Sequence, residues 1–378
     1  MSARRRVVVL RGTAANPWDL RPWESLGDGY DVSVVVPPNN LYDTGGVGLR
    51  RVGVRTVGGR LGGGRLGALG TRAVGERYVG LAEHLDGADI VHAAELGTWF
   101  SAQAAGLRER LGFRLALTVW ETLPFLDAYR NVRTRPYRRA TLAAADLYLA
   151  TTERARDALV LEGAAPERIR IAPPGVDVER FAAARVPAPA ADGSHLVLSV
   201  GRLVWEKGHQ DVLRAVALLR RDSDAPRRDV RVLILGVGPE EARLRALAAD
   251  LGLSDAVEFR GFTPYAELPA VYAQASCLVL ASLAVPHWEE QFGMVLAEAM
   301  AAHVPVLAAA SGAIPEVVGG SGTLFGSGDW VGLAAALRDG PLAGTPGARR
   351  APEPERLARF GADAAAARLR AAYDELLG

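Results

Sequence analysis

Short apolar runs that alternate with helical segments constrain the fold of this chain more than any other feature. In the second half, runs of strand length lie at residues 195–200, 231–235, 257–260, 278–281, 304–308 and 323–325. Amphipathic helical patterns lie between or after them, near 209–220, 239–251, 266–274, 293–302 and 329–338. Strands that alternate with helices form parallel sheets with helices on both faces, so the pattern predicts an α/β fold.

The first half repeats the alternation less regularly. Its apolar runs lie at residues 7–10, 32–36, 90–93, 115–119, 147–150 and 169–172. The Gly-rich stretch 37–70 lacks a period and predicts loops with one or two short strands. A length of 378 residues exceeds what one core usually supports. Pro and Gly accumulate near 173–194, which marks a linker. We therefore expect a first Rossmann-like domain at 1–173, a linker at 174–194, a second Rossmann-like domain at 195–350 and a C-terminal helix at 351–378.

Cysteine content and hydropathy indicate in which cellular compartment the protein is expected. Cys277 is the only cysteine, which excludes an internal disulfide framework and favours a reducing environment. No run reaches the roughly 18 apolar residues that a membrane span needs. The apolar run at 7–10 is too short for the core of a signal peptide. The sequence predicts a cytoplasmic protein, which leaves peripheral contact with the inner face of a membrane open.

Positive charge gathers in the first half. Seven arginines lie within residues 45–80, and a second cluster comprises Arg130, Arg133, Arg135, Arg138 and Arg139. Such clusters attract phosphates and anionic membranes, and they are equally typical of a solvated protein face. No basic-aromatic platform or nucleic-acid-binding motif accompanies them, which argues against nucleic acid as a partner.

Lys207 is the only lysine among 44 basic residues, and it lies in a loop at residues 201–208 directly after a predicted strand. Arg202 precedes it by five positions, and Gly201 and Gly208 bound the loop. Glycine lets the backbone approach a ligand closely, and paired Arg and Lys suit a diphosphate. The loop predicts a phosphate site. The alternative is a surface loop with an internal ion pair.

Two glutamates, Glu290 and Glu298, flank the start of a predicted helix that begins near residue 292 or 293. Free amides at a helix start favour an anion or sugar oxygens, and a nearby carboxylate can accept bonds from sugar or ribose hydroxyls. The alternative is a capping carboxylate and a solvated helical one. Taken alone, two glutamates at this spacing are a weak signal.

The order of these motifs along the chain is more specific. The phosphate loop is followed by Gly261 and Phe262 after a strand, by the glutamate pair, and by residues 312–316 and 322–325. Across residues 145–340 this order resembles the retaining GT-B glycosyltransferases of family 4. Residues 173–177 also resemble the family's segment at the domain junction, with Pro174 in place of Asn. The resemblance implies two Rossmann-like domains that face a cleft, and a C-terminal helix that crosses back to the first domain.

The resemblance also implies roles for single residues. Arg202 and Lys207 would bind the donor diphosphate, Glu290 the transferred sugar and Glu298 the ribose. Gly201 belongs to the phosphate loop, and Gly261 and Phe262 would lie near the base. Phe292, Gly293 and Met294 would offer backbone amides to the sugar and phosphate.

The first domain departs from the family pattern. A Gly-Gly loop is common after the first strand, whereas this chain has the single Gly12, which we assign to the donor site. Where many members carry His, Glu121 follows a predicted strand and is the candidate for a base or a sugar-binding group. A structural carboxylate is the equal alternative. Glu95 is a second carboxylate that could face the cleft. His92 could substitute for the missing His, but it is expected to be a core histidine at a strand end. His287 and Trp288 are candidate walls of the sugar pocket.

The sequence thus predicts a metal-independent, retaining transferase that uses a UDP- or GDP-sugar and an unknown glycan, lipid or small-molecule acceptor. The histidine pattern supports no metal site, and Asp222 with Asp224 is expected in a turn. The alternatives are a sugar-nucleotide epimerase or hydrolase and a non-catalytic nucleotide-sugar-binding protein. The oligomeric state is not predicted.

Overall fold

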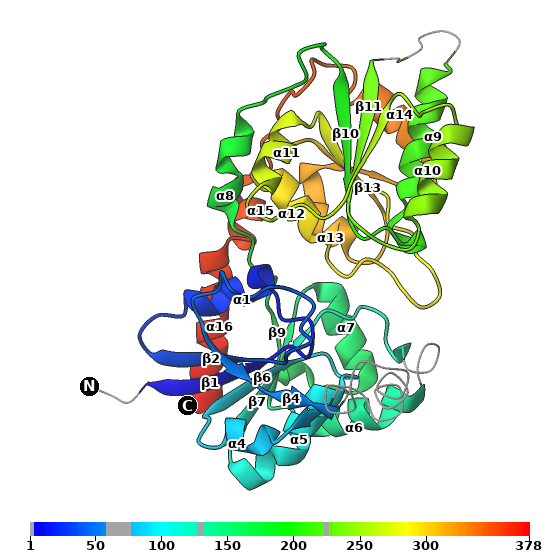
Figure 1. Ribbon diagram of the computed structural model, residues 1–378. Helices are drawn as coiled ribbons and strands as arrows, with labels where there is room; N and C mark the ends of the chain where they lie inside the picture. The colour runs from blue at the N-terminus through cyan, green and yellow to red at the C-terminus, as the bar shows by residue number, and fades with distance from the viewer. Residues whose placement is uncertain (1–3, 58–76, 127–131, 223–226, 228) are drawn as a thin grey trace. The chain divides into compact units, whose positions relative to one another are not determined.

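The computed structural model describes residues 4–57, 77–126, 132–222, 227 and 229–378. It divides the chain into two compact units, Met1–Gly175 with Ala362–Gly378, and Val176–Gly361 (Figure 1). Each unit contains its own parallel sheet, so the expected pair of α/β domains is present. Asp224, Arg130 and the arginines at 60, 65 and 72 lie outside the described residues.

The first unit is built on a seven-stranded parallel sheet with the order β3-β2-β1-β6-β7-β8-β9. Its strands are β1 (Arg5–Leu10), β2 (Tyr30–Val36), β3 (Arg50–Gly53), β6 (Ile90–Ala94), β7 (Arg114–Val119), β8 (Leu147–Ala150) and β9 (Ile169–Ile171). A short antiparallel pair, β4 (Arg55–Thr56) and β5 (Tyr78–Val79), is separate from it. The short strands β3 and β4 lie in the Gly-rich stretch, as expected there.

Helices cover both faces of this first sheet (Figure 1). One face carries α4 (Leu81–Leu85), α5 (Trp99–Leu111), α6 (Arg135–Ala144) and α7 (Glu153–Glu162). The other face carries α1 (Pro17–Glu24) and the C-terminal α16 (Ala362–Leu377). Leu369 and Tyr373 of α16 share a buried cluster with Val7 and Trp23. The end of the chain therefore completes the core of the unit in which the chain begins.

The second unit has six parallel strands in the order β12-β11-β10-β13-β14-β15. They are β10 (His195–Val200), β11 (Val230–Leu235), β12 (Val257–Arg260), β13 (Cys277–Leu280), β14 (Val306–Ala309) and β15 (Thr323–Phe325). One face is covered by α9 (His209–Arg220), α10 (Glu241–Asp250) and α14 (Trp330–Asp339). The opposite side carries α11 (Leu268–Gln274), α12 (Met294–Ala301) and α13 (Ile314–Val318). In sheets of this order, ligands bind beyond the carboxyl ends of the strands, next to the strand where the order reverses. That strand is β10.

The segment predicted as a linker is not uniformly extended. It contains α8 (Val178–Ala182), whose Asp177 caps the helix by accepting a hydrogen bond from the amide of Arg180. Phe181 of α8 is fully buried and packs edge-on against Tyr272 of α11. Residues 178–185 therefore belong to the second unit. Near the other end of that unit lies α15 (Pro354–Arg359).

Candidate functional site

The loop after β10 is held in one conformation by buried contacts. Residues 205–207 form a turn of 3-10 helix, and Gly208 follows with a φ of +71°. A Cβ on Gly208 would lie 1.8 Å from the carbonyl oxygen of Ala281, so only glycine fits there. His209 is buried, and burial lowers its pKa to about 4. Its neutral ring accepts from the hydroxyl of Ser199 and donates to the carbonyl of Arg202, at 2.8 and 3.2 Å.

Lys207 and Glu290 form the central ion pair of this region. The ammonium nitrogen of Lys207 lies 2.7 Å from Oε2 and 3.0 Å from Oε1 of Glu290. The side chains are only 15% and 8% exposed, so water screens the pair weakly. The indole of Trp288 lies 5.1 Å from the same ammonium, within range of a cation–π contact. Of the two proposed sugar-pocket walls, Trp288 is thus close to Lys207, whereas His287 is exposed.

Several contacts hold Glu290 and the loops around it in place. The fully buried Ser282, two residues beyond β13, donates a 2.6 Å hydrogen bond to Oε2. The amide of Ala313 donates to the carbonyl of Glu290 at 2.9 Å, and a Cβ on Gly312 would lie 2.1 Å from that oxygen. The amide of Leu283 donates to the carbonyl of Glu206 at 2.8 Å. The loops after β10 and β13 therefore form one connected backbone structure.

Arg202 and Glu298 are placed differently from this pair. The Arg202 side chain is exposed. Glu298 lies at the fifth position of α12, just over one turn into the helix, because α12 begins at Met294 and not at the expected 292 or 293. Its buried carboxylate accepts a 2.9 Å hydrogen bond from the hydroxyl of Tyr272. Burial raises the pKa of Glu298 to about 7, and the Tyr272 hydrogen bond opposes part of that rise.

The start of α12 and the end of β12 place the remaining donor-site candidates of this unit. Gly293 precedes the helix with a φ of +80°, and Met294 is its first residue. The ring of Phe292 is buried edge-on against Phe360, so only its backbone can meet a ligand. Phe262 is 71% exposed, just after β12. The exposed Val237, which sequence reasoning missed, lies near Gly261, 3.9 Å from where a Cβ would stand.

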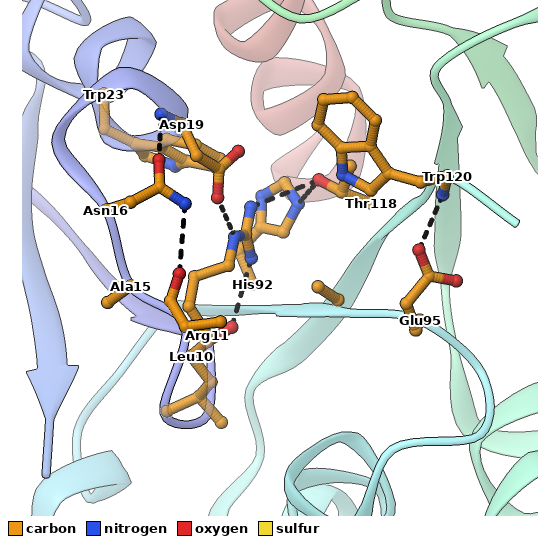
Figure 2. A network of polar contacts seen from close by, with 12 residues as sticks. Leu10, Arg11, Ala15, Asn16, Asp19, Trp23, His92, Glu95, Thr118 and Trp120 are labelled. Carbon is orange, nitrogen blue, oxygen red and sulfur yellow. Dashed lines mark hydrogen bonds and ion pairs between the residues drawn. The ribbon is translucent and has the colours of Figure 1, made fainter. Parts of the chain in front are cut away.

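In the first unit, Arg11 is the centre of a buried polar network (Figure 2). Its guanidinium bonds Asp19 at 2.7 Å and Thr118 at 3.4 Å, and it lies 4.8 Å from the ring centroid of Trp23. His92 bridges Thr118 and Tyr373, at 2.7 and 2.6 Å. Burial depresses the pKa of His92 strongly, so its ring is neutral. His92 is therefore a core histidine, as expected.

Glu95 and Glu121 follow neighbouring strands, β6 and β7. Oε1 of Glu95 accepts from the amide of Trp120 at 2.8 Å (Figure 2). Oε1 of Glu121 accepts from the amides of Thr122 and Leu123 at 3.0 and 2.9 Å. Burial and the charge of Glu121 raise the pKa of Glu95 to about 8. Both carboxylates thus hold the backbone after β7. This agrees with a structural role for Glu121, and a catalytic role stays a prediction.

The single glycine after β1 is also held by a side chain. Gly12 has a φ of +61°, and its carbonyl accepts a 3.1 Å hydrogen bond from the hydroxyl of Tyr78.

Within the described residues, no group of three or more His, Cys, Asp or Glu is arranged to hold a metal ion. None of the described helices combines the length and apolar character that crossing a bilayer requires.

Two doubly wound α/β units, the second with a cation-bearing loop beside β10, are the architecture of the GT-B fold. Residues 26–180 match the family model described as Glycosyltransferase Family 4, and residues 181–339 match the model described as Glycosyl transferases group 1. The D-inositol 3-phosphate glycosyltransferase 1 of Catenulispora acidiphila is 34% identical over 311 residues, covering 75% of this chain and 72% of that protein. The chain therefore belongs to glycosyltransferase family 4.

Other similarities agree with this membership. The D-inositol 3-phosphate glycosyltransferase of Nocardia farcinica is 38% identical over 229 residues, covering 56% of this chain. The match spans 49% of that protein, about half its length. The Anabaena protein Alr3699/HepE, solved with UDP and glucose, superposes with a TM-score of 0.72. It is 18% identical, and the match covers 98% of this chain and all of that one, which shows a shared fold.

Proposed function

We propose that this chain transfers a sugar from a nucleotide-diphosphate sugar to an acceptor hydroxyl, with the donor bound by the second unit. The observation that carries the proposal is the Lys207–Glu290 pair, with its partner Ser282, beside the strand where the sheet order reverses. The site combines a cation for phosphate with a fixed carboxylate for sugar hydroxyls. The complex of Alr3699/HepE with UDP and glucose supports a nucleotide-sugar donor.

In this proposal, different charged residues of the second unit bind different parts of the donor. Lys207 and the exposed Arg202 bind the diphosphate and stabilise the negative charge that grows on it as the sugar departs. Two cations in a fixed loop supply this stabilisation without a metal ion. The amides at the start of α12 add hydrogen-bond donors for an anion. Glu290 accepts bonds from hydroxyls of the sugar.

Glu298 is the proposed ribose ligand. A carboxylate accepts bonds from both ribose hydroxyls when it is ionised, and its lone pairs not used by Tyr272 are suited to this. The exposed Phe262 and Val237 offer apolar surface for the base, which favours neither uracil nor guanine. The donor is therefore proposed as a UDP- or GDP-sugar.

Retention of configuration is proposed from family membership. The acceptor hydroxyl attacks the anomeric carbon from the same face as the departing diphosphate, whose bond to that carbon breaks. A phosphate oxygen of the leaving group takes the hydroxyl proton. Glu121 is the proposed group of the first unit that acts on the sugar or the acceptor, in the position where many family members carry His. The acceptor is a glycan, a lipid or a small molecule, and the relatives named for D-inositol 3-phosphate place that compound first in an acceptor panel.

We also propose that arginines of the first unit attract an anionic membrane surface. Arg139 on α6 is exposed, whereas Arg138 is 12% exposed and pairs with Glu162 at 3.0 Å. The cluster thus offers less charge than its sequence suggests. Flotation with phosphatidylglycerol vesicles, and its loss in Arg139→Glu, would support this contact. Equal flotation with phosphatidylcholine vesicles would reject it.

The experiment that tests the function is a transfer assay over a panel of UDP- and GDP-sugars, with and without acceptor. Acceptor-dependent formation of a glycoside, with the anomeric configuration read by NMR, supports a retaining transferase. Conversion or hydrolysis of the donor at the same rate without acceptor supports the epimerase or hydrolase alternative. Binding of a donor without turnover on any acceptor supports the non-catalytic alternative.

A further inference from the structure

The two cations proposed for the diphosphate differ in one respect. Arg202 is exposed, whereas Lys207 is already neutralised by both carboxylate oxygens of Glu290. A diphosphate that binds Lys207 must therefore compete with Glu290 for the same ammonium. Because both side chains are largely buried, the carboxylate cannot simply turn to bulk water when its cation is lost.

The support around Glu290 keeps the carboxylate in place during such an exchange. Ser282 donates to Oε2, and Ala313 with the close backbone of Gly312 holds the main chain of Glu290. Lys207 is the flexible partner, since its four-carbon stem can move the ammonium toward a phosphate. Once Lys207 has moved, Ser282 remains the only hydrogen-bond donor that the described residues give this carboxylate.

We propose that Glu290 makes the donor site sense the presence of the sugar by competing with the diphosphate for Lys207. This inference rests on the proposed function. A nucleotide sugar brings hydroxyl donors that replace the ammonium on Glu290, so the exchange costs little. A nucleoside diphosphate alone brings none and leaves a buried carboxylate short of donors, which is costly. After transfer, Glu290 recovers Lys207 and weakens the hold on the diphosphate product.

Calorimetric titration of the full chain with UDP, GDP, UDP-glucose and GDP-mannose tests this exchange. Glu290→Gln removes the competing charge and keeps the shape of the side chain. It should bind the preferred nucleoside diphosphate about tenfold more tightly than the wild type, while its preference for the sugar nucleotide falls. Glu206→Gln is the matched control, because it removes a negative charge one position from Lys207 that lies outside the pair. It should change the affinity less than about twofold.

Ser282→Ala gives a second measurement with the opposite sign, and it applies even if Glu290→Gln unfolds. Without the hydroxyl, the described part of the chain gives the released carboxylate no donor, so nucleoside diphosphate binding should weaken severalfold. Unchanged or weaker binding of the nucleoside diphosphate to Glu290→Gln, or equal tightening in Glu206→Gln, overturns the inference. So does unchanged binding to Ser282→Ala. If no nucleotide binds the wild type, or Lys207→Ala binds as the wild type does, the proposed donor site fails and the inference fails with it.

Discussion

The hydroxyl of Tyr272 donates a 2.9 Å hydrogen bond to Oε2 of Glu298, and both side chains are buried between α11 and α12. Burial raises the pKa of Glu298 to about 7, and the hydrogen bond from Tyr272 lowers it in part. A carboxyl with a pKa near neutrality accepts ribose hydroxyls fully only when it is ionised. The proposed ribose ligand should therefore change its protonation state near neutral pH.

Donor binding should accordingly depend on pH around 7. As pH falls through 7, Glu298 is protonated and the donor KM should rise, while Glu298→Gln should show a higher KM with no such dependence. Tyr272→Phe removes a contact that lowers the pKa, so the midpoint should move upward. Donor KM measured from pH 5.5 to 8.5 checks all three. An identical pH profile of the donor KM in wild type and Glu298→Gln would contradict the assignment of Glu298 as the ribose ligand.

The same carboxyl affects folding stability with a defined sign. Its folded pKa of about 7 lies above the ordinary value of 4.5, so the folded state binds the proton more tightly. Its contribution is fully present below pH 4.5 and is lost as pH rises through 7. Relative to the wild type, Glu298→Gln should therefore gain up to about 3 kcal/mol between pH 5 and pH 8. Urea unfolding at both pH values measures this gain, and equal differences at the two values would contradict it.

Lys207 should contribute directly to turnover. Lys207→Ala removes a preorganised charge that stabilises the leaving diphosphate, so turnover should fall about tenfold to a thousandfold. Lys207→Arg keeps the charge and serves as the matched control, with a smaller loss expected. The measurement is kcat with saturating donor and acceptor. Near-wild-type turnover in Lys207→Ala would remove the phosphate assignment.

Sequence reasoning located the elements that carry the second-unit site but not the contacts that shape it. Lys207 and Glu290 could be chosen because each follows a strand of clear period, and carboxyl ends of parallel strands lie along one edge. Ser282, two residues after β13, follows a strand in the same way, so its position could have indicated it too. Tyr272 carried none, since its place on α11 is typical of a core residue, and only the packing of α11 on α12 brings it to Glu298.

Some helices and contacts could not be predicted from the sequence, first of all in the first unit. The helix α1 begins at Pro17 after the cap Asn16, a recognisable start, but its internal Pro22 hides the helical pattern. In the second unit, the short α8 is likewise concealed by the Pro and Gly that flank it. The network of Arg11, His92 and Tyr373 joins residues more than 270 positions apart, which no local pattern reveals.

Tyr373 should be a stabilising residue of the first unit. Its hydroxyl accepts from the indole of Trp23 at 2.8 Å and bonds His92 at 2.6 Å. Tyr373→Phe leaves both buried groups without this partner, which should cost about 1–3 kcal/mol in the free energy of unfolding. Tyr42→Phe, at an exposed position, is the control and should change it by less than about 0.5 kcal/mol. Equal stabilities of the two variants would show that the network does not stabilise the unit.

Gly208 and Gly106 should respond in opposite directions to alanine. Gly208 has a φ of +71° and no room for a Cβ beside the Ala281 carbonyl, so Gly208→Ala should destabilise the second unit by at least about 1–3 kcal/mol. It should also impair donor binding, because Lys207 is the neighbouring residue. Gly106 lies inside α5 with open space where a Cβ would stand, so Gly106→Ala should stabilise by about 0.5–1 kcal/mol. Thermal unfolding with and without the nucleotide measures both. A Gly208→Ala variant as stable as the wild type would mean that the loop after β10 is not held by that backbone contact.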